Sequence, residues 1–407
     1  MVEVKVNRRG AERIRSGHPW IYRSDIVDAG GAEPGQPVRV VDPRGQFLGA
    51  AHYSSTSQIA LRLLSPKQIP IDAAFFQNRI LAAKAHRDRL VRDTQAYRLV
   101  HAEADFLPGL IIVRYHDCLV LSALSQGMDA ATPDIVSALT GLYQPRAIVA
   151  RNDAHARKLE SLPQENKILH GELPGPVEVA INGLVFHADL LEGQKTGIFL
   201  DQRENYLAAS RHAHGHALDC FTSTGGFGLH LAQHCETVEA VDSSVHAIAS
   251  ATRNRDANSI SNITYRQADV FELLAGYAHA RRRFDVVVLD PPAFAKSRAT
   301  VESGLRGYGE INYRALQLLQ PGGVLITCSC SHHVSEADLL QAIAQASLDA
   351  GRTVRVLERR TQSNDHPILL TVPETHYLKC LILEVASVPS HVRIDNRSLR
   401  SRLGNRC

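Results

Sequence analysis

Residues 217–232 read ALDCFTSTGGFGLHLA, and this stretch decides the fold. An apolar run ends at Phe221, glycines follow at positions 225, 226 and 228, and a helical pattern begins there. Small residues at such a turn let the backbone approach a ligand closely, and the free N–H groups of the helix start point at that ligand. Taken alone, the turn fits dinucleotide binding or plain strand–helix packing as well as any other cofactor site.

Further apolar runs alternate with helical stretches from residue 216 onward. They are ALDCF, VEAVD, ITYRQAD, FDVVVLD, GVLITCS, VRVLERR and KCLILEV. Continuous apolar runs are typical of strands that are buried on both faces, as in a parallel sheet covered by helices. We therefore expect an α/β, Rossmann-like domain with a mostly parallel seven-stranded sheet.

Three of these predicted strands end in acidic residues. Asp242 is placed to accept hydrogen bonds from ribose hydroxyls, and Asp269 from an adenine amino group, with Val270 beside the ring. The next strand ends in Asp290-Pro291-Pro292, where two prolines hold the chain extended and direct the Asp290 carboxylate into the crevice at the strand ends. A nicotinamide enzyme has no evident use for this last element, whereas a base-modifying methyltransferase does. The strand ends together predict S-adenosylmethionine as the cofactor.

The fifth strand carries two thiols, Cys328 and Cys330, to the same edge of the sheet. Residues two apart on a strand share a face, so both cysteines are expected to point toward the crevice. A cysteine in an apolar strand is usually an inert small side chain. The chemical alternative is covalent catalysis, in which a thiolate adds to carbon 6 of a pyrimidine and turns carbon 5 into a nucleophile. Asp290 would hold the pyrimidine edge, and the sequence does not identify the base that removes the carbon 5 proton.

The first half of the chain indicates two smaller domains. Short β-type runs at 38–41, 47–51 and 59–64 predict a small barrel or sandwich, and mixed strands and a helix near 133–142 predict an α+β unit. Residues 72–92 are expected to form an amphipathic helix. Its predicted apolar side holds Phe75, Ile80, Ala83 and Leu90, and its predicted exposed side holds Arg79, Lys84, Arg87 and Arg89.

Composition excludes little. The 45 Lys+Arg residues barely exceed the 42 Asp+Glu residues, so charge alone does not announce a nucleic-acid partner. The seven cysteines lack zinc-type spacing, and the alternating His212, His214 and His216 are better explained as a polar loop than as metal ligands, so we expect no metal. No secretion signal or apolar run of about 18 residues is present, which predicts a cytoplasmic protein without a membrane partner.

At these motifs the chain resembles the bacterial large-subunit ribosomal-RNA methyltransferases that make 5-methylcytosine and carry an N-terminal PUA domain. The matching segments are HPWIY, EADFLPGLIIVRY, GQKTGIFLDQREN, FTSTGGFG, DPPAFAKS and ITCSCSHH, in the family's order across nearly the whole chain. The resemblance implies a PUA-like RNA-binding domain at 1–70, an α+β connecting domain at 71–185, a class I methyltransferase domain at 186–386 and a basic tail at 387–407. It also implies ribosomal RNA, 23S or its precursor particle, as the partner.

The resemblance further assigns roles to residues. The cysteine of the Ser-Cys-Ser strand end is the family's proposed nucleophile and maps onto Cys330, although a related group places its nucleophile in a setting like that of Cys328. GQKTGIFLDQREN, with Lys195, is expected to cover the cofactor and the base, and Arg203 to contact cofactor or RNA. Lys296, Tyr308 and Asn312 flank the base pocket in sequence and are expected to be structural. The cofactor residues that we expect are Phe221, Ser223, Gly225, Gly226, Asp242, Ser243, Asp269, Val270, Asp290 and Arg203.

Two other functions stay open at this point. Related ribosomal-RNA methyltransferases that act on guanine share FLDQR and TGGFG and have Asp-Pro-Pro-Thr-Phe in place of DPPAF, and guanine chemistry would leave Cys330 without a role. A non-catalytic RNA-binding assembly factor is disfavoured because the acidic cofactor positions are intact. The sequence does not decide the oligomeric state, and a homodimer is compatible with it.

Overall fold

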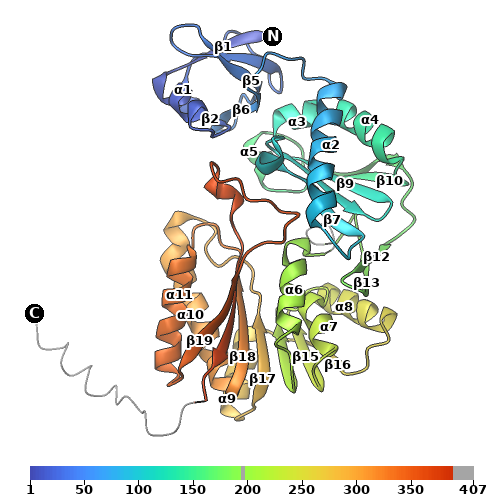
Figure 1. Cartoon of the computed structure of the whole chain (residues 1–407), viewed down its shortest axis with the longest axis vertical. Helices are drawn as coiled ribbons and strands as arrows, with labels where there is room; N and C mark the ends of the chain where they lie inside the picture. Colours follow the sequence, from blue (N-terminus) through green and yellow to red (C-terminus); the bar gives the residue numbers. More distant parts are fainter. Residues whose placement is uncertain (194–197, 388–407) are drawn as a thin grey trace, which may run out of the picture. The chain divides into compact units, whose positions relative to one another are not determined.

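A six-stranded sheet with one helix opens the chain in the computed structural model, which describes residues 1–193 and 198–387 (Figure 1). The strand order is β2-β6-β5-β4-β1-β3, with β1 parallel to β4 and the other pairs antiparallel. Alternate residues such as Val4, Val38 and Leu61 form its core, which explains why these runs become strands. Its elements are β1 Val2–Val6, α1 Arg8–Arg15, β2 Trp20–Tyr22, β3 Ile26–Asp28, β4 Pro37–Val41, β5 Phe47–Tyr53 and β6 Ile59–Ser65. The predicted small β domain is confirmed.

A five-stranded sheet of order β11-β10-β9-β8-β7 follows, together with its helices. The elements are α2 Ala73–Leu90, β7 Ala96–His101, β8 Leu110–Tyr115, β9 Cys118–Ala123, α3 Gln126–Ala130, α4 Thr132–Tyr143, β10 Ala147–Arg151, α5 Ala156–Leu159 and β11 Asn166–Gly171. Residues 174–183, PGPVEVAING, contain β12 Val177–Ile181, which pairs antiparallel with β13 Leu184–Ala188. The α+β character that the sequence predicted is present.

The faces of α2 differ from the prediction at Arg87 and at Leu90, and Leu90, which was expected on the apolar side, is 43% exposed. Phe75, Ile80 and Ala83 lie in the core as expected. Arg87, however, is 1% exposed and donates to both carboxylate oxygens of Asp105. A buried guanidinium is accommodated where a carboxylate takes both ends of its fork, and hydropathy does not reveal such a pair.

The C-terminal half forms a seven-stranded sheet of order β16-β15-β14-β17-β18-β20-β19. All pairs are parallel except those of β20, which runs antiparallel to β18 and β19. The strands are β14 His216–Cys220, β15 Thr237–Asp242, β16 Ile263–Gln267, β17 Phe284–Leu289, β18 Leu319–Ser329, β19 Val354–Arg360 and β20 Lys379–Val385. The helices are α6 Arg203–Ser210, α7 Gly226–Ala232, α8 Val245–Ala257, α9 Val270–His279, α10 Val301–Leu318 and α11 Glu336–Asp349. The predicted Rossmann-like sheet is confirmed.

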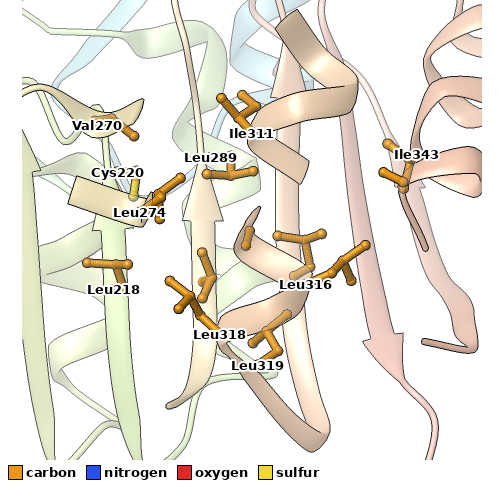
Figure 2. Close-up of a cluster of buried hydrophobic side chains, with 14 of the residues drawn as sticks. Leu218, Cys220, Val270, Leu274, Leu289, Ile311, Leu316, Leu318, Leu319 and Ile343 are labelled. Carbon is orange, nitrogen blue, oxygen red and sulfur yellow. The ribbon is translucent and has the colours of Figure 1, made fainter. Parts of the chain in front are cut away.

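Side chains from one face of this sheet pack against α9, α10 and α11. Figure 2 shows Leu218 and Cys220 of β14 and Leu289 of β17 in this cluster with Leu274 and Leu316 of the helices. On β14 the intervening Asp219 belongs to the opposite face and contacts the start of α7. This shared core holds the strands in register, and so it holds together the strand ends that were predicted to form the site.

The chain divides into two compact units that do not follow a single cut in the sequence. The first holds residues 1–205, 256–259 and 362–377, and the second holds 206–255, 260–361 and the chain from 378. Short 3-10 turns add η1 Arg23–Asp25, η2 Ala102–Asp105, η4 Leu200–Gln202, η5 Arg298–Thr300 and η6 Pro373–Thr375. Among the described helices, none is long and apolar enough to cross a membrane. The basic tail predicted at 387–407 lies outside the described residues except for Ser387.

Candidate active site

The glycine-rich turn between β14 and α7 has an unusual backbone. Phe221 and Ser223 adopt φ values of 64° and 50°, and Gly225 adopts 90°, so three positions of one short turn lie in the left-handed region. A Cβ atom on Gly226 would stand 2.3 Å from the ring of Tyr206. Tyr206 thus packs closely against the turn. The turn follows the carboxyl end of β14, which is where open α/β sheets bind cofactors.

Asp219 holds this turn from beneath, a role that the sequence reasoning missed. Its Oδ2 accepts hydrogen bonds from the Thr222 hydroxyl at 2.6 Å and from the Gly228 amide at 2.8 Å. The residue is fully buried, and this burial raises the pKa of the Asp219 carboxyl to about 7. The sequence signal that could have indicated this role is an aspartate inside the otherwise apolar strand β14.

Asp242 joins the second strand to the same turn. Its two oxygens accept from the Ser223 amide at 3.0 Å and from the Ser244 amide at 2.9 Å, and the side chain is half-buried. Ser243 is exposed beside it. Each Asp242 oxygen keeps further acceptor capacity, which suits a hydroxyl-bearing ligand.

The third strand end differs in detail from the prediction. Asp269 is exposed and caps α9 by accepting from the Glu272 amide at 3.0 Å, which occupies one of its oxygens. Val270 is 3% exposed, and its side chain belongs to the core cluster in Figure 2. A contact between the Val270 side chain and an adenine ring would therefore use only a small exposed area.

Cys330 and the Asp-Pro-Pro turn lie next to each other. Asp290, just beyond β17, is half-buried, and its amide lies 3.4 Å from the Cys220 carbonyl oxygen. Cys330 follows the last residue of β18, and its thiol points at the Pro291 carbonyl oxygen at 3.9 Å. The two strand ends thus bring a partly exposed thiol and a carboxylate to one edge of the sheet.

Burial separates the two candidate cysteines. Cys328 has no exposed surface and lies directly across from Cys380 of β20, whereas Cys330 is half-buried beyond the end of the strand. The expectation that both thiols are open to the crevice is wrong for Cys328, because its side chain is fully buried. Cys330 is therefore the more accessible of the two cysteines.

Serine hydroxyls on both sides of Cys330 are tied to α10. The Ser329 hydroxyl donates to the Tyr308 hydroxyl at 2.9 Å, and the Tyr308 and Ser331 hydroxyls are 2.9 Å apart. The Ser331 hydroxyl also accepts from the Ala295 amide at 3.1 Å, which links it to the DPPAF turn. Tyr308 is fully buried, as its predicted structural role requires. The hydroxyl chain fixes the backbone on either side of the thiol.

Two neighbouring predictions concern Lys296 and Asn312. Lys296 is exposed, whereas Asn312 is buried and its side-chain amide donates to the Tyr308 carbonyl oxygen at 2.8 Å. Asn312 therefore has the structural role that we expected, within α10 itself.

The FLDQR segment belongs to the first compact unit. Arg203 is 2% exposed, donates to the Arg92 carbonyl oxygen at 3.1 Å and pairs with Asp365 at 3.5 Å. A contact of Arg203 with cofactor or RNA would require an exposed guanidinium, and the Arg203 side chain is buried. Asp201 of the same segment accepts from the Tyr377 hydroxyl at 2.8 Å. Lys195 lies outside the described residues, so the predicted cover over the site stays a prediction.

The histidine series has ordinary partners. His212 pairs with Glu358 at 2.9 Å, and His216 lies 2.9 Å from the Thr237 hydroxyl. Within residues 1–193 and 198–387, no group of three or more His, Cys, Asp or Glu side chains is arranged to hold a metal ion.

Comparisons with known proteins agree with the fold and the site. Residues 4–66 match the family described as PUA-like domain, and residues 211–370 match the family described as methyltransferase domain. A solved structure of a putative methyltransferase complexed with SAH covers 95% of this chain and 100% of its own at a TM-score of 0.82, with 21% sequence identity. A putative SAM-dependent methyltransferase from Streptococcus mutans has a TM-score of 0.80 at the same coverage and identity. The second unit thus has the fold of class I S-adenosylmethionine-dependent methyltransferases, and a PUA-like domain precedes it in the sequence.

Sequence relatives narrow this class. The ribosomal RNA large subunit methyltransferase I of Shewanella frigidimarina is 41% identical over 395 residues, which are 94% of this chain and 99% of that protein. Its namesake from Tolumonas auensis is 42% identical over 377 residues, 90% and 95% of the two chains. The chain belongs to the ribosomal RNA large subunit methyltransferase I family.

The residues at the sheet edge fit S-adenosylmethionine, the cofactor of this class. Glycine is needed at both positions of the turn, because a Cβ atom on Gly225 would stand 3.0 Å from the Tyr265 hydroxyl and one on Gly226 would stand 2.3 Å from the Tyr206 ring. The Asp242 carboxylate stands at the neighbouring strand end. We expect these groups to hold the nucleoside part of the cofactor, which supplies an electrophilic methyl group when it is bound.

Proposed function

We propose that the protein methylates carbon 5 of a cytosine in large-subunit (23S) ribosomal RNA, with Cys330 as a covalent nucleophile. The observation that carries this proposal is the position of Cys330. Its thiol is partly exposed at the end of β18, beside the Asp290-Pro291-Pro292 turn and 3.9 Å from the Pro291 carbonyl oxygen. Family membership supports ribosomal RNA, naked or in a precursor particle, as the substrate.

The chemistry explains why a thiol is useful there. Carbon 5 of cytosine is too weak a nucleophile to accept a methyl group unaided. When the Cys330 sulfur bonds to carbon 6, the electron pair of the 5,6 double bond moves toward carbon 5 and makes it nucleophilic. In this proposal Asp290 holds the polar edge of the base and stabilises its protonated ring nitrogen. Methylation of carbon 5 breaks the sulfur–methyl bond of the cofactor. A base then takes the carbon 5 proton, the electron pair of that bond restores the 5,6 double bond, and the sulfur–carbon 6 bond breaks with the Cys330 sulfur keeping its electron pair.

The serine and tyrosine hydroxyls support this assignment. They fix the backbone on both sides of Cys330 and tie it to the segment after Asp290 through the Ala295 amide. A nucleophile and a base-binding carboxylate must keep a constant separation, because misplacement by about 1 Å can cost about a hundredfold in rate.

A trapping experiment tests the nucleophile. The full chain is incubated with S-adenosylmethionine and large-subunit RNA that contains 5-fluorocytosine, whose fluorine at carbon 5 prevents release of the enzyme. We expect an adduct that survives denaturing electrophoresis and maps by peptide mass spectrometry to Cys330. Cys330→Ala should form none, and Cys328→Ala, the matched control, should form it. Absence of the adduct with the native protein, or its persistence in Cys330→Ala, would refute the proposal.

A further inference from the structure

Lys379, the first residue of β20, is a buried cation beside the Cys330 strand end. It lies directly across from Ser329 in the antiparallel pair of β18 and β20, and it is 4% exposed. Its Nζ donates to the Ser331 carbonyl oxygen at 2.7 Å. The ammonium group is therefore fixed on the backbone of the residue that follows Cys330.

The charges around the strand end come from several elements. They are Asp290 after β17, Tyr308 on α10, His332 and His333 after β18, Glu336 on α11 and Lys379 on β20. The Glu336 carboxylate pairs with Arg359 of β19, while both histidines are exposed to solvent. Tyr308 is buried, and burial raises the pKa of its hydroxyl, so it stays neutral near pH 7. Lys379 is the buried cation of this group.

Electrostatic coupling connects Lys379 to the thiol. Burial lowers the pKa of the Lys379 ammonium to about 8, while attraction to Cys330 and to Glu336 acts in the opposite direction. Such coupling is reciprocal: if the thiolate of Cys330 stabilises the charged form of Lys379, the Lys379 ammonium stabilises the thiolate by the same free energy. Near pH 7 most of the Lys379 side chains still carry their proton.

We propose that Lys379 is a positioning residue that stabilises the thiolate of Cys330 through its fixed ammonium group. A lysine beside a cysteine lowers the pKa of the thiol below its usual value of about 8.5. The proton of the thiol passes to solvent, and the Sγ atom retains the electron pair with which it attacks. The use of this thiolate in catalysis rests on the proposed function, whereas its ionisation does not.

The test measures the ionisation of Cys330 in the native full-length protein. Alkylation by iodoacetamide is followed from pH 5 to 10, and the peptide that contains Cys330 is quantified by mass spectrometry. We expect the wild-type midpoint to lie about one pH unit or more below that of Lys379→Met, with alkylation about tenfold faster at pH 7. Lys379→Arg, which keeps the charge, should keep a low midpoint. Lys296→Met, an exposed lysine of the same unit, should behave as wild type.

Two results would overturn the proposal. One is a wild-type Cys330 midpoint at or above the ordinary thiol value, which needs no variant and so does not depend on whether Lys379→Met folds. The other is an unchanged midpoint in Lys379→Met, provided that the buried Cys220 remains protected from alkylation and thereby reports a native fold.

Failure of this inference is distinguishable from failure of the proposed function. A low midpoint that depends on Lys379, with no adduct on 5-fluorocytosine RNA, supports Lys379 and refutes the nucleophile. An adduct on Cys330 with an ordinary thiol midpoint refutes Lys379 alone.

Discussion

At the scale of single residues, the buried carboxyl of Asp219 links strand β14 to the cofactor turn. It accepts from Thr222 and Gly228, and its other oxygen, Oδ1, has no hydrogen-bond partner among the described residues. An ionised carboxylate in such a site is costly, which explains the raised pKa of about 7. The turn is therefore expected to respond to pH.

We predict that Asp219 makes the protein less stable as pH rises from about 4 to about 7. In that range the folded state holds a proton on Asp219 that the unfolded state has released, so the contribution is complete below the unfolded pKa of 3.8 and is lost toward the folded pKa of about 7. Asp219→Asn removes this contribution, which amounts to at most about 4 kcal/mol for a shift of about three units. Urea unfolding at several pH values measures the difference from wild type. Asp349→Asn, at an exposed site, is the control, and parallel pH profiles for wild type and Asp219→Asn would contradict the prediction.

Gly226→Ala is predicted to disturb the cofactor turn. The new Cβ would stand 2.3 Å from the ring of Tyr206, which is packed against Phe227 and His230 and cannot move aside easily. We expect a loss of about 1–3 kcal/mol in the free energy of unfolding and weaker binding of S-adenosylmethionine by calorimetry. Gly276→Ala in α9, where nothing lies within 4 Å of the new atom, should bind normally. Wild-type affinity in Gly226→Ala would show that the turn does not hold the cofactor.

Residue types and strand ends predicted much of the candidate site, and the errors have physical reasons. The acidic strand ends follow from the rule that ligands bind at the carboxyl ends of parallel strands, whereas the choice of Cys330 over Cys328 came from the family resemblance. The resemblance assigned Arg203 to the cofactor or RNA, but the Arg203 side chain is buried and pairs with Asp365, which is far away in the sequence. Lys379 was also missed, since its proximity to Ser331 arises from the pairing of β18 with β20.

At the scale of elements, α10 holds the end of β18 through one side chain. The hydroxyl of Tyr308 on this helix is hydrogen-bonded to both Ser329 and Ser331. Because Cys330 lies between these serines, the helix sets the position of the thiol relative to the Asp-Pro-Pro turn.

Tyr308→Phe should therefore lower both activity and stability. We expect kcat to fall about tenfold or more as the thiol loses its fixed position, and the free energy of unfolding to fall by about 1–3 kcal/mol for the broken hydrogen bonds. Methyl transfer to RNA and urea unfolding measure the two effects. Tyr313→Phe on the same helix, which loses only a bond to Gln317, is the matched control. Equal kcat values in the two variants would refute the role of α10.

Element prediction succeeded where hydrophobic runs were long. The seven strands of the large sheet all coincide with predicted runs, although only the inner strands are buried on both faces and the edge strands β16 and β19 are largely exposed. Helix α1 was not expected, since its sequence RRGAERIR is mostly charged and buries only Gly10 and Ala11. The buried face of Arg87 on α2 was missed for the same reason, namely that polar partners replace apolar contacts.

At the scale of the whole molecule, the chain combines a PUA-like domain with a methyltransferase domain. The loop 362–377 between β19 and β20 belongs to the first compact unit, although both strands belong to the second. Within the first unit Asp365 accepts from the Arg98 amide at 2.8 Å, and its carbonyl oxygen accepts from Arg87 at 2.9 Å. Local sequence patterns do not show that residues 362–377 pack with a unit formed mainly by the first half of the chain, so the sequence did not predict these two units.

The identity of the methylated nucleoside tests the central claim most directly. The full chain and isotopically methyl-labelled S-adenosylmethionine are incubated with large-subunit ribosomal RNA and, separately, with precursor particles isolated from cells that lack the enzyme. The RNA is then digested to nucleosides and analysed by mass spectrometry. Our account predicts labelled 5-methylcytidine, which disappears with Cys330→Ala and remains with Cys328→Ala. Label in a methylguanosine, retained in Cys330→Ala, would contradict it.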